Sequence, residues 1–288
     1  MTNFFEKSSN ARMRSARTAE RASLVTDREL TVKEVMRDHE FDAKGFDPVA
    51  SEVAQIRLAH GTGIKLPKNG GQPIVVAGGD FMAPAIEAYK SLRTRVMRAQ
   101  ASRGIRSVAV TSAAPSEGKT LTTLNLACCC AQLENTPVLL IDADLRTRGL
   151  TALIGNLPAV GLANVLSGTA SREEAISKTD MPNLYVMGAG KSDTPPTELF
   201  SADKWLQFME WATASFKLVL MDSLPVGTVT DYDLIEAGCD GVLMVVRALS
   251  ARRQALESAL EQVDPKKMLG VVWNGANRSE RDYTYGAR

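Results

Sequence analysis

From residue 107 onward, short runs of apolar residues alternate with longer stretches in which apolar residues recur at helical spacing. The short runs are unbroken, as expected for strands that are buried on both faces of a sheet. Helices between such strands predict an α/β fold with a mostly parallel sheet and helices on both faces. The expected strands are SVAVTS (107–112), PVLLIDAD (137–144), NLYVMGAG (183–190), KLVLMD (217–222), GVLMVV (241–246) and MLGVVWN (268–274), and the expected helices are 84–100, 120–134, 197–213, 231–239 and 251–263.

The first 75 residues lack this alternation. They are polar, carry a basic cluster at 12–21, and end in a stretch rich in glycine and proline that is typical of a linker. We expect a partly disordered and partly helical extension over residues 1–75, a nucleotide-binding domain over 76–275, and a flexible tail over 276–288. The basic cluster is either a solvated tail or a contact for a membrane surface or a partner.

Composition and charge narrow the function only slightly. The chain has 288 residues, of which 44% are hydrophobic, and a formal net charge of +1, so bulk charge gives no argument for nucleic acid. No apolar run reaches the roughly 18 residues of a spanning helix, and no signal-peptide pattern opens the sequence. The four cysteines have no metal-binding spacing and are expected to be buried. We therefore expect a cytoplasmic protein that binds no nucleic acid and reaches a membrane only through a partner.

The segment TSAAPSEGKT at 111–120 follows an expected strand and precedes an expected helix, which is the context of a phosphate-binding loop. Its end fits the G-x-x-x-x-G-K-[ST] pattern, but Ala113 replaces the leading glycine, and a small residue serves there if its φ is negative. Backbone N–H groups cradle phosphate oxygens, the lysine reaches the β- and γ-phosphates, and the threonine hydroxyl reaches Mg²⁺. The expected ATP-binding residues are Ala114, Pro115, Ser116, Glu117, Gly118, Lys119, Thr120 and Leu121.

Three aspartates follow expected strands. Asp142 and Asp144 end one strand, where the strand period of two points both to the same side, and Asp222 ends another. Three carboxylates beside a triphosphate repel one another unless a cation lies among them, and Mg²⁺ takes oxygen ligands. Any one of them alone is also common as a helix cap after a strand. Together with the loop they predict a P-loop NTPase that uses ATP and Mg²⁺.

The segments APSEGKT, LLIDADLR and LVLMDSLPV together resemble the bacterial tyrosine autokinases (BY-kinases), cytosolic kinase domains tied to exopolysaccharide production. Asp142, Asp144 and Arg146 match the second acidic Walker motif of that family, apolar-x-x-D-x-D-x-R. The resemblance covers roughly residues 80–288, although Leu224 stands where the family usually has proline. The long polar extension is most similar to the branch encoded with exosortase-type polysaccharide loci.

The resemblance implies an ATP-dependent protein-tyrosine autokinase that regulates exopolysaccharide synthesis or export. It implies that Lys119 and Thr120 bind the phosphates and Mg²⁺, and that Asp144 and Asp222 hold the metal directly or through water. Asp142 is expected to orient or deprotonate the attacking tyrosine, and Arg146 to contact ATP. Lys119, Asp142 and Asp144 are thus the expected catalytic residues. The implied partner is a membrane-bound polysaccharide chain-length regulator that activates the kinase.

Two further features of the family are altered here. Its Glu-x-x-Arg-x-x-Arg subunit-contact helix corresponds to Glu87, Lys90 and Arg93, and lysine cannot form the bidentate fork of arginine. This helix is expected to support a homo-oligomer, with a solvated basic face as the alternative. The expected phosphoacceptors in the tail are Tyr283 and Tyr285, fewer than many family tails carry, and an unmodified end is the alternative.

Two other functions stay open. A ParA/MinD-like positioning ATPase shares the fold and the acidic strand ends, but it has a second lysine early in the loop, where this chain has Ala114. A nucleotide-binding regulatory subunit of a polysaccharide assembly complex, with little kinase activity, fits the sparse tyrosines and the altered helix. Phosphate on the tail tyrosines distinguishes the kinase from both.

Overall fold

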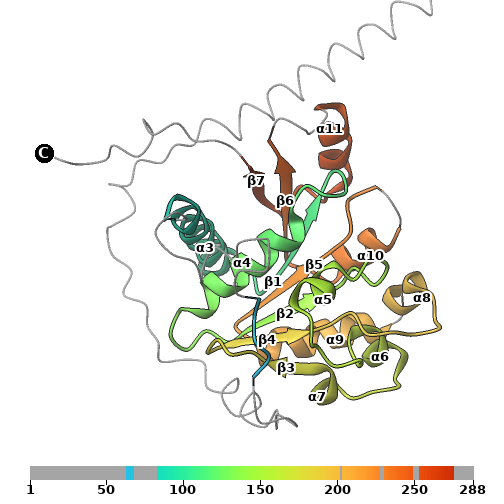
Figure 1. Cartoon of the computed structure of the whole chain (residues 1–288). Helices are drawn as coiled ribbons and strands as arrows, with labels where there is room; N and C mark the ends of the chain where they lie inside the picture. Colours follow the sequence, from blue (N-terminus) through green and yellow to red (C-terminus); the bar gives the residue numbers. More distant parts are fainter. Residues whose placement is uncertain (1–62, 68–82, 202, 228–229, 249–252, 276–288) are drawn as a thin grey trace, which may run out of the picture. The chain divides into compact units, whose positions relative to one another are not determined.

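The computed structural model describes residues 63–67, 83–201, 203–227, 230–248 and 253–275, in which strands and helices alternate (Figure 1). Within these ranges, no helix is long and apolar enough to cross a membrane. The strands are β1 (Ser107–Ser112), β2 (Val138–Asp142), β3 (Ile176–Lys178), β4 (Leu184–Met187), β5 (Leu218–Asp222), β6 (Gly241–Arg247) and β7 (Met268–Asn274). The helices are α3 (Ala83–Arg103), α4 (Lys119–Ala131), α5 (Gly149–Ile154), α6 (Leu162–Ser167), α7 (Arg172–Ala175), α8 (Pro196–Ser201), α9 (Asp203–Ser215), α10 (Asp231–Ala237) and α11 (Arg253–Gln262).

The described strands form one seven-stranded sheet in the order β3-β4-β2-β5-β1-β6-β7. Each neighbouring pair is parallel except β3 and β4, which are antiparallel. Every residue of β1, β2 and β5 is buried, because these central strands are covered on both faces and their apolar runs are unbroken. The mostly parallel sheet that the sequence predicts is therefore confirmed.

Helices cover both faces of the sheet (Figure 1). On one face α3, α4 and α5 pack on residues such as Val108, Val110 and Leu140. On the other face α6, α8 and α9 pack on Ala109 and neighbouring side chains, while α10 and α11 cover β6. Both cores alternate along the same strands, as the strand period of two requires.

The expected elements are confirmed, although several short elements and some strand ends differ. Strand β3 and the short helices α5, α6 and α7 were not predicted, because three to six residues carry too little periodicity to detect. The helix expected over 197–213 is described on both sides of residue 202, as α8 and α9. The expected strand 137–144 ends at Asp142, so Asp144 lies in the loop that follows.

Residues 63–67, which fall in the expected linker, pair with the edge of the sheet. Ile64 forms a parallel bridge with Thr179, and its N–H donates to the carbonyl of Lys178 at 2.8 Å. Leu66 is buried in the same core as α3 and α4. The remainder of the expected extension and the tail lie outside the described residues.

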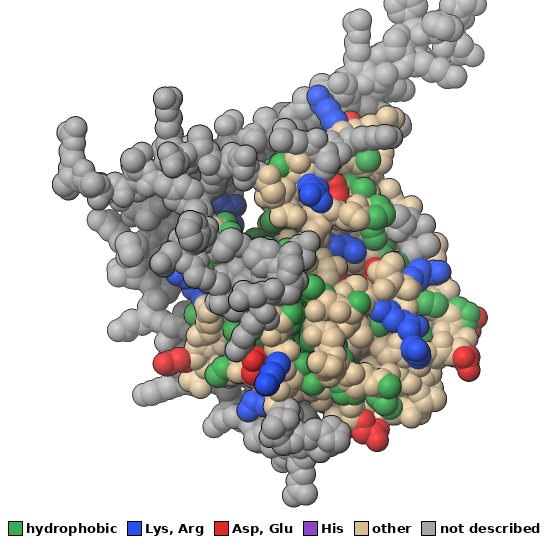
Figure 2. All heavy atoms as spheres, in the orientation of Figure 1, with side chains coloured by type: hydrophobic (Ala, Val, Ile, Leu, Met, Phe, Trp, Pro, Cys, Tyr) green, Lys and Arg blue, Asp and Glu red, His purple; other side chains and the backbone are tan. Residues whose placement is uncertain are grey.

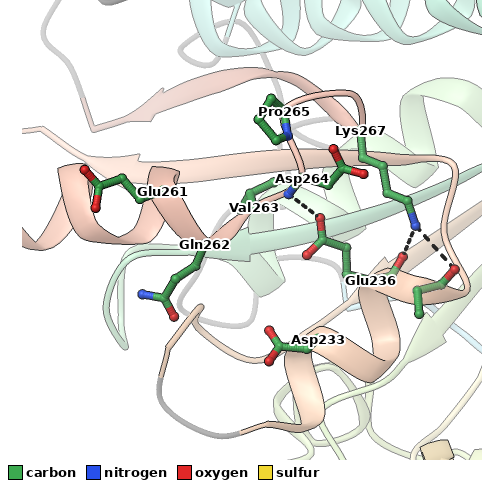
Figure 3. Close-up of a pocket in the computed structure, with 9 residues that line it drawn as sticks. Asp233, Glu236, Glu261, Gln262, Val263, Asp264, Pro265 and Lys267 are labelled. Atoms are coloured by element: carbon green, nitrogen blue, oxygen red, sulfur yellow. Dashed lines mark hydrogen bonds between the residues drawn. The ribbon is translucent and has the colours of Figure 1, made fainter. Parts of the chain in front are cut away.

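The described surface carries both signs of charge. Lys and Arg side chains and Asp and Glu side chains are scattered singly or in small groups over the face in Figure 2. A hollow of about 470 Å³, here called the α10–α11 hollow, lies between the end of α10, the end of α11 and the start of β7 (Figure 3). Its lining residues are Asp233, Glu236, Ala237, Glu261, Gln262, Val263, Asp264, Pro265 and Lys267.

Candidate active site

The loop between β1 and α4 has the geometry of a phosphate cradle. Gly118 caps α4 in the left-handed region at φ 93°, and Ser116 also has positive φ. Ala113 is not among the residues with positive φ, so its Cβ causes no strain and a leading glycine is unnecessary. The N–H groups of the first turn of α4 therefore face the loop opening, where a phosphate would lie.

One hydrogen bond within this loop and one from a distant strand hold it in shape. The buried Glu117 carboxylate accepts a hydrogen bond from the N–H of Ala114 at 3.0 Å, which ties the two ends of the loop together. Asn274, at the end of β7, donates its Nδ2 hydrogen to the carbonyl of Glu117 at 2.9 Å. A Cβ on Gly118 would lie 2.0 Å from Asn274 Nδ2, so any other residue here would displace the Asn274 side chain and adopt a strained positive φ. The loop is held in shape before any ligand binds.

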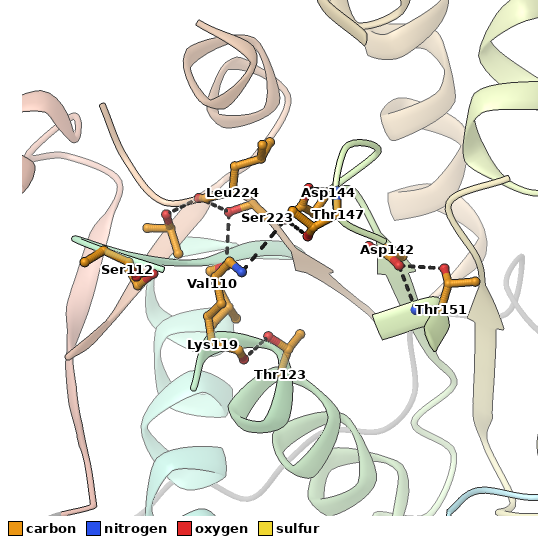
Figure 4. Close-up of polar contacts among 12 residues, drawn as sticks. Val110, Ser112, Lys119, Thr123, Asp142, Asp144, Thr147, Thr151, Ser223 and Leu224 are labelled. Carbon is orange, nitrogen blue, oxygen red and sulfur yellow. Dashed lines mark hydrogen bonds and ion pairs between the residues drawn. The ribbon is translucent and has the colours of Figure 1, made fainter. Parts of the chain in front are cut away.

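Two of the predicted aspartates are direct neighbours in the sheet. Asp142 and Asp222 end adjacent strands and stand opposite each other in the register of β2 and β5. Both are fully buried, and Asp144 is 1% exposed. Lys119 at the start of α4 extends toward the same place, with its Nζ 3.9 Å from Asp144 Oδ2 (Figure 4). The structure thus brings together the four residues that the sequence predicted.

Asp222 is the least satisfied of these groups. Within the described part of the chain, neither of its carboxylate oxygens has a hydrogen-bond partner. Burial raises its pKa to about 7, while the positive charge of Lys119 and the nearby Thr120 hydroxyl lower it and the neighbouring Asp142 and Asp144 raise it further. A buried carboxylate without partners is unfavourable unless a cation or a proton neutralises it. Asp222 is therefore suited to hold a metal ion.

Asp144 is held in one orientation by the chain that follows it. Its Oδ1 accepts the N–H of Thr147 at 2.9 Å, and its Oδ2 accepts the Thr147 hydroxyl at 2.6 Å. The same Oδ2 is the atom nearest to Lys119. A carboxyl group can accept more than these bonds, so Asp144 also has capacity for a metal-bound water.

Asp142 is satisfied on one oxygen only. Its Oδ2 accepts both the N–H of Thr151 at 2.7 Å and the Thr151 hydroxyl at 2.6 Å (Figure 4). Its Oδ1 is buried and has no partner among the residues that the structure describes. Burial raises the pKa of Asp142 to about 6, although the two bonds from Thr151 oppose this. Such a carboxyl is suited to accept a proton near neutral pH.

Arg146 is committed to an ion pair on the side of α10. Its Nε donates to Asp231 Oδ2 at 2.7 Å and its guanidinium also reaches Oδ1 at 3.2 Å, so the pair is bidentate. Asp231 is fully buried, whereas the Arg146 side chain is 44% exposed. The expected contact of Arg146 with ATP stays a prediction. Asp231 itself was not predicted, because the sequence marked it only as the start of a helix.

The residues fit Mg²⁺ and a nucleotide phosphate, although the carboxylates alone do not form a metal site. Among the described residues, no three His, Cys, Asp or Glu side chains converge as a ready ligand set. Mg²⁺ usually keeps several waters and takes one or two carboxylates together with substrate phosphates. The unpartnered oxygens of Asp222 meet that need, and Gly149 leaves open space beside Thr120, because a Cβ there would lie 3.3 Å from the Thr120 hydroxyl.

The expected subunit-contact residues lie on α3. Lys90 and Glu87 pair with each other at 2.7 Å, and both side chains are exposed. Arg93 instead donates to the carbonyl of Cys129 on α4 at 3.0 Å, so it serves packing within the chain. Their role between subunits stays a prediction. Tyr283 and Tyr285 lie outside the described residues, and their role as phosphoacceptors stays a prediction as well.

Relatives of known identity point to one family. No family model matches the chain. The chain is 33% identical over 203 residues to tyrosine-protein kinase YwqD of Bacillus subtilis (strain 168), which covers 69% of this chain and 85% of that protein. It is 32% identical over 209 residues to tyrosine-protein kinase CpsD of Streptococcus agalactiae, which covers 70% of this chain and 90% of that one.

Solved structures agree with these relatives. The chimerical protein CapA2B2 superposes with a TM-score of 0.66 at 25% identity, over 80% of this chain and all (100%) of that one. The BceF tyrosine kinase domain superposes with a TM-score of 0.61 at 29% identity, over 67% of this chain and 78% of that one. The chain therefore belongs to the family of bacterial tyrosine-protein kinases.

Proposed function

We propose that the chain transfers the γ-phosphate of Mg-ATP to Tyr283 and Tyr285 in its own tail or that of a second copy. The observation that carries the proposal is the set of Lys119, Asp142 and Asp222 around a preformed phosphate loop, with three buried carboxylate oxygens unpartnered among the described residues. Such oxygens are unfavourable in the free protein and are satisfied by a metal ion and by the proton of an attacking hydroxyl.

Each residue has a distinct task in this proposal. The loop N–H groups and the Lys119 ammonium bind the phosphates, and Thr120, Asp144 and Asp222 hold Mg²⁺ directly or through water. Bound Mg²⁺ supplies neutralisation of the phosphate charge. Asp142 accepts the proton of the tyrosine hydroxyl while the tyrosine oxygen bonds to the γ-phosphorus, and the bond from that phosphorus to the bridging oxygen breaks to release ADP.

The biological setting follows from the resemblance of the sequence. We place the chain in the exosortase-associated branch of the family, as a cytoplasmic regulator of exopolysaccharide synthesis or export. A membrane-bound chain-length regulator is its proposed activator, and homo-oligomers formed through α3 are its proposed active state.

Mass spectrometry of the purified full chain after incubation with Mg-ATP tests the proposal. We expect phosphate on Tyr283 or Tyr285 that is lost in Lys119→Met, because the variant lacks the charge that neutralises the β- and γ-phosphates. Lys178→Met, an exposed lysine on β3, is the matched control and should be phosphorylated normally. The measurement is made with and without the membrane-bound regulator, and Mg-ATP binding without phosphotyrosine in either case would favour a regulatory subunit over a kinase.

A further inference from the structure

Thr151, in the short helix α5, contacts Asp142 through two atoms. Its N–H and its hydroxyl both donate to the same oxygen, Asp142 Oδ2, at 2.7 and 2.6 Å. The helix reaches this position because Arg148 adopts a left-handed backbone at φ 55° and turns the chain back toward the end of β2. Thr151 therefore bears directly on the carboxyl group that faces the reacting atoms in the proposed function.

A third contact fixes the direction of the Thr151 hydroxyl. The N–H of Ala189, just after β4, donates to Thr151 Oγ1 at 2.9 Å. A backbone N–H only donates, so the hydroxyl must accept from Ala189 and direct its own hydrogen to Asp142. Asp142 Oδ2 therefore receives two hydrogens at once and has little capacity for a third.

Asp144 is also bonded by a threonine, Thr147, but in a different arrangement. Thr147 gives its N–H to one oxygen of Asp144 and its hydroxyl to the other, so both oxygens of Asp144 are hydrogen-bonded. Thr151 places both of its hydrogens on a single oxygen of Asp142, and the other oxygen, Oδ1, stays buried without a partner in the described structure. The first arrangement occupies both oxygens of the carboxyl group, and the second leaves one oxygen available for a proton.

We propose that Thr151 is a positioning residue for phosphoryl transfer, which holds Asp142 Oδ2 so that Oδ1 alone receives the proton of the acceptor tyrosine. The inference rests on the proposed function, because it assumes that Asp142 is the proton acceptor. The proton moves from the tyrosine hydroxyl to Oδ1 as the new oxygen–phosphorus bond forms, and ADP takes the electrons of the broken bond. Thr151 itself exchanges no proton and touches no substrate.

The decisive variant is Thr151→Val, which keeps the shape and the N–H but removes the hydroxyl. We expect the rate of phosphotyrosine formation at saturating Mg-ATP to fall about 10- to 100-fold, in the range typical of residues that orient a catalytic group. The ATP concentration at half-maximal rate should stay within about twofold, because Thr151 binds no phosphate. Thr151→Ser, which restores the hydroxyl, should recover the rate to within about threefold of the original.

Several measurements keep the outcome unambiguous. Thr213→Val removes the hydroxyl of a helical threonine on α9 that bonds the Met209 carbonyl, and it should keep full activity. Thermal unfolding and Mg-ATP binding establish that each variant is folded, and Thr151→Ala replaces the valine variant if that one does not fold. Full activity in the hydroxyl-free variants overturns the inference, as does equal loss in Thr151→Ser or a loss confined to ATP affinity.

Asp142→Asn separates this inference from the proposed function. Substantial phosphorylation by Asp142→Asn means that Asp142 is not the proton acceptor. The role given to Asp142 in the proposed function then fails, whatever the result for Thr151. An inactive Asp142→Asn together with a fully active Thr151→Val leaves the proposed function standing and removes only the role of Thr151.

Discussion

Two acidic regions of the molecule differ in how their carboxylates are satisfied. At the carboxyl ends of β2 and β5, Asp142 and Asp222 are fully buried and three of their four oxygens lack a partner among the described residues. In the α10–α11 hollow, Glu236 is 7% exposed and accepts the N–H of Asp264 at 2.8 Å (Figure 3). Lys267 contributes positive charge beside it and donates to the carbonyls of Glu236 and Ala237.

The difference indicates which of the two regions is suited to catalysis. The buried acid of the hollow is hydrogen-bonded and its lysine caps the end of α10, as expected for stable surface structure. At the strand ends, buried carboxylate oxygens have no partner among the described residues, so a ligand or a proton must satisfy them. Unsatisfied buried carboxylates, rather than the hollow, are therefore the feature that marks the proposed reactive centre of this kinase.

The largest effect should come from Asp222→Asn. Removing one charge from the proposed metal site should lower the rate of phosphotyrosine formation by about 1,000-fold or more, because the metal supplies several kcal/mol of charge stabilisation in phosphoryl transfer. The rate is measured on the full chain at saturating Mg-ATP. A loss of less than about tenfold would mean that Asp222 does not hold the metal.

The same variant should lower the rate but raise the free energy of unfolding. The pKa of Asp222 is raised by burial to about 7, so the folded chain retains this proton at pH values where the unfolded chain has released it. The proton on Asp222 therefore stabilises the folded chain at about pH 4, and this stabilisation is lost as the pH rises to about 7. Without Mg²⁺ or nucleotide, Asp222→Asn should become more stable than the original above pH 7, by up to about 4 kcal/mol.

Denaturant unfolding of both proteins from pH 4 to pH 8, with a chelator present, measures this difference. The difference in free energy of unfolding should widen between about pH 4 and pH 7 and stay constant above. Saturating Mg-ATP should reduce it, because the ligand stabilises the original protein more than the variant. A difference that does not change with pH would show that the Asp222 carboxyl is ionised in the free fold.

The sequence predicted the parts of this site that are local. The strands at 107–112 and 268–274 were predicted with the bounds that the structure shows, because a buried parallel strand is a continuous apolar run. The loop and the aspartates were predicted because each stands within a few residues of a strand end. A small residue such as Ala113 was expected to serve in the loop only if its φ is negative, and it is not among the residues with positive φ, so the altered loop motif still forms a cradle.

Contacts between distant segments were not predictable. Asn274 braces a loop residue 157 positions earlier, and Asp231 pairs with an arginine 85 positions earlier, so neither pair leaves a spacing pattern. Thr151 is only nine positions from Asp142, but its contact depends on the left-handed turn at Arg148, which non-glycine residues rarely adopt. The path of the chain in three dimensions, and therefore the hydrogen-bond partner of each polar group, could not be predicted from the sequence.

The smallest effect should come from the α10–α11 hollow, through Glu236→Ala. The variant leaves the N–H of Asp264 without its acceptor, which should lower the free energy of unfolding by about 1 kcal/mol, since water in the open hollow offsets part of the loss. The rate of phosphotyrosine formation should stay within twofold. Glu261→Ala, an exposed acid of the same hollow, is the matched control and should change neither quantity. Glu236 is a buried acid like Asp222. A large loss of activity in Glu236→Ala at unchanged stability would therefore show that the α10–α11 hollow, and not only the strand ends, takes part in the reaction.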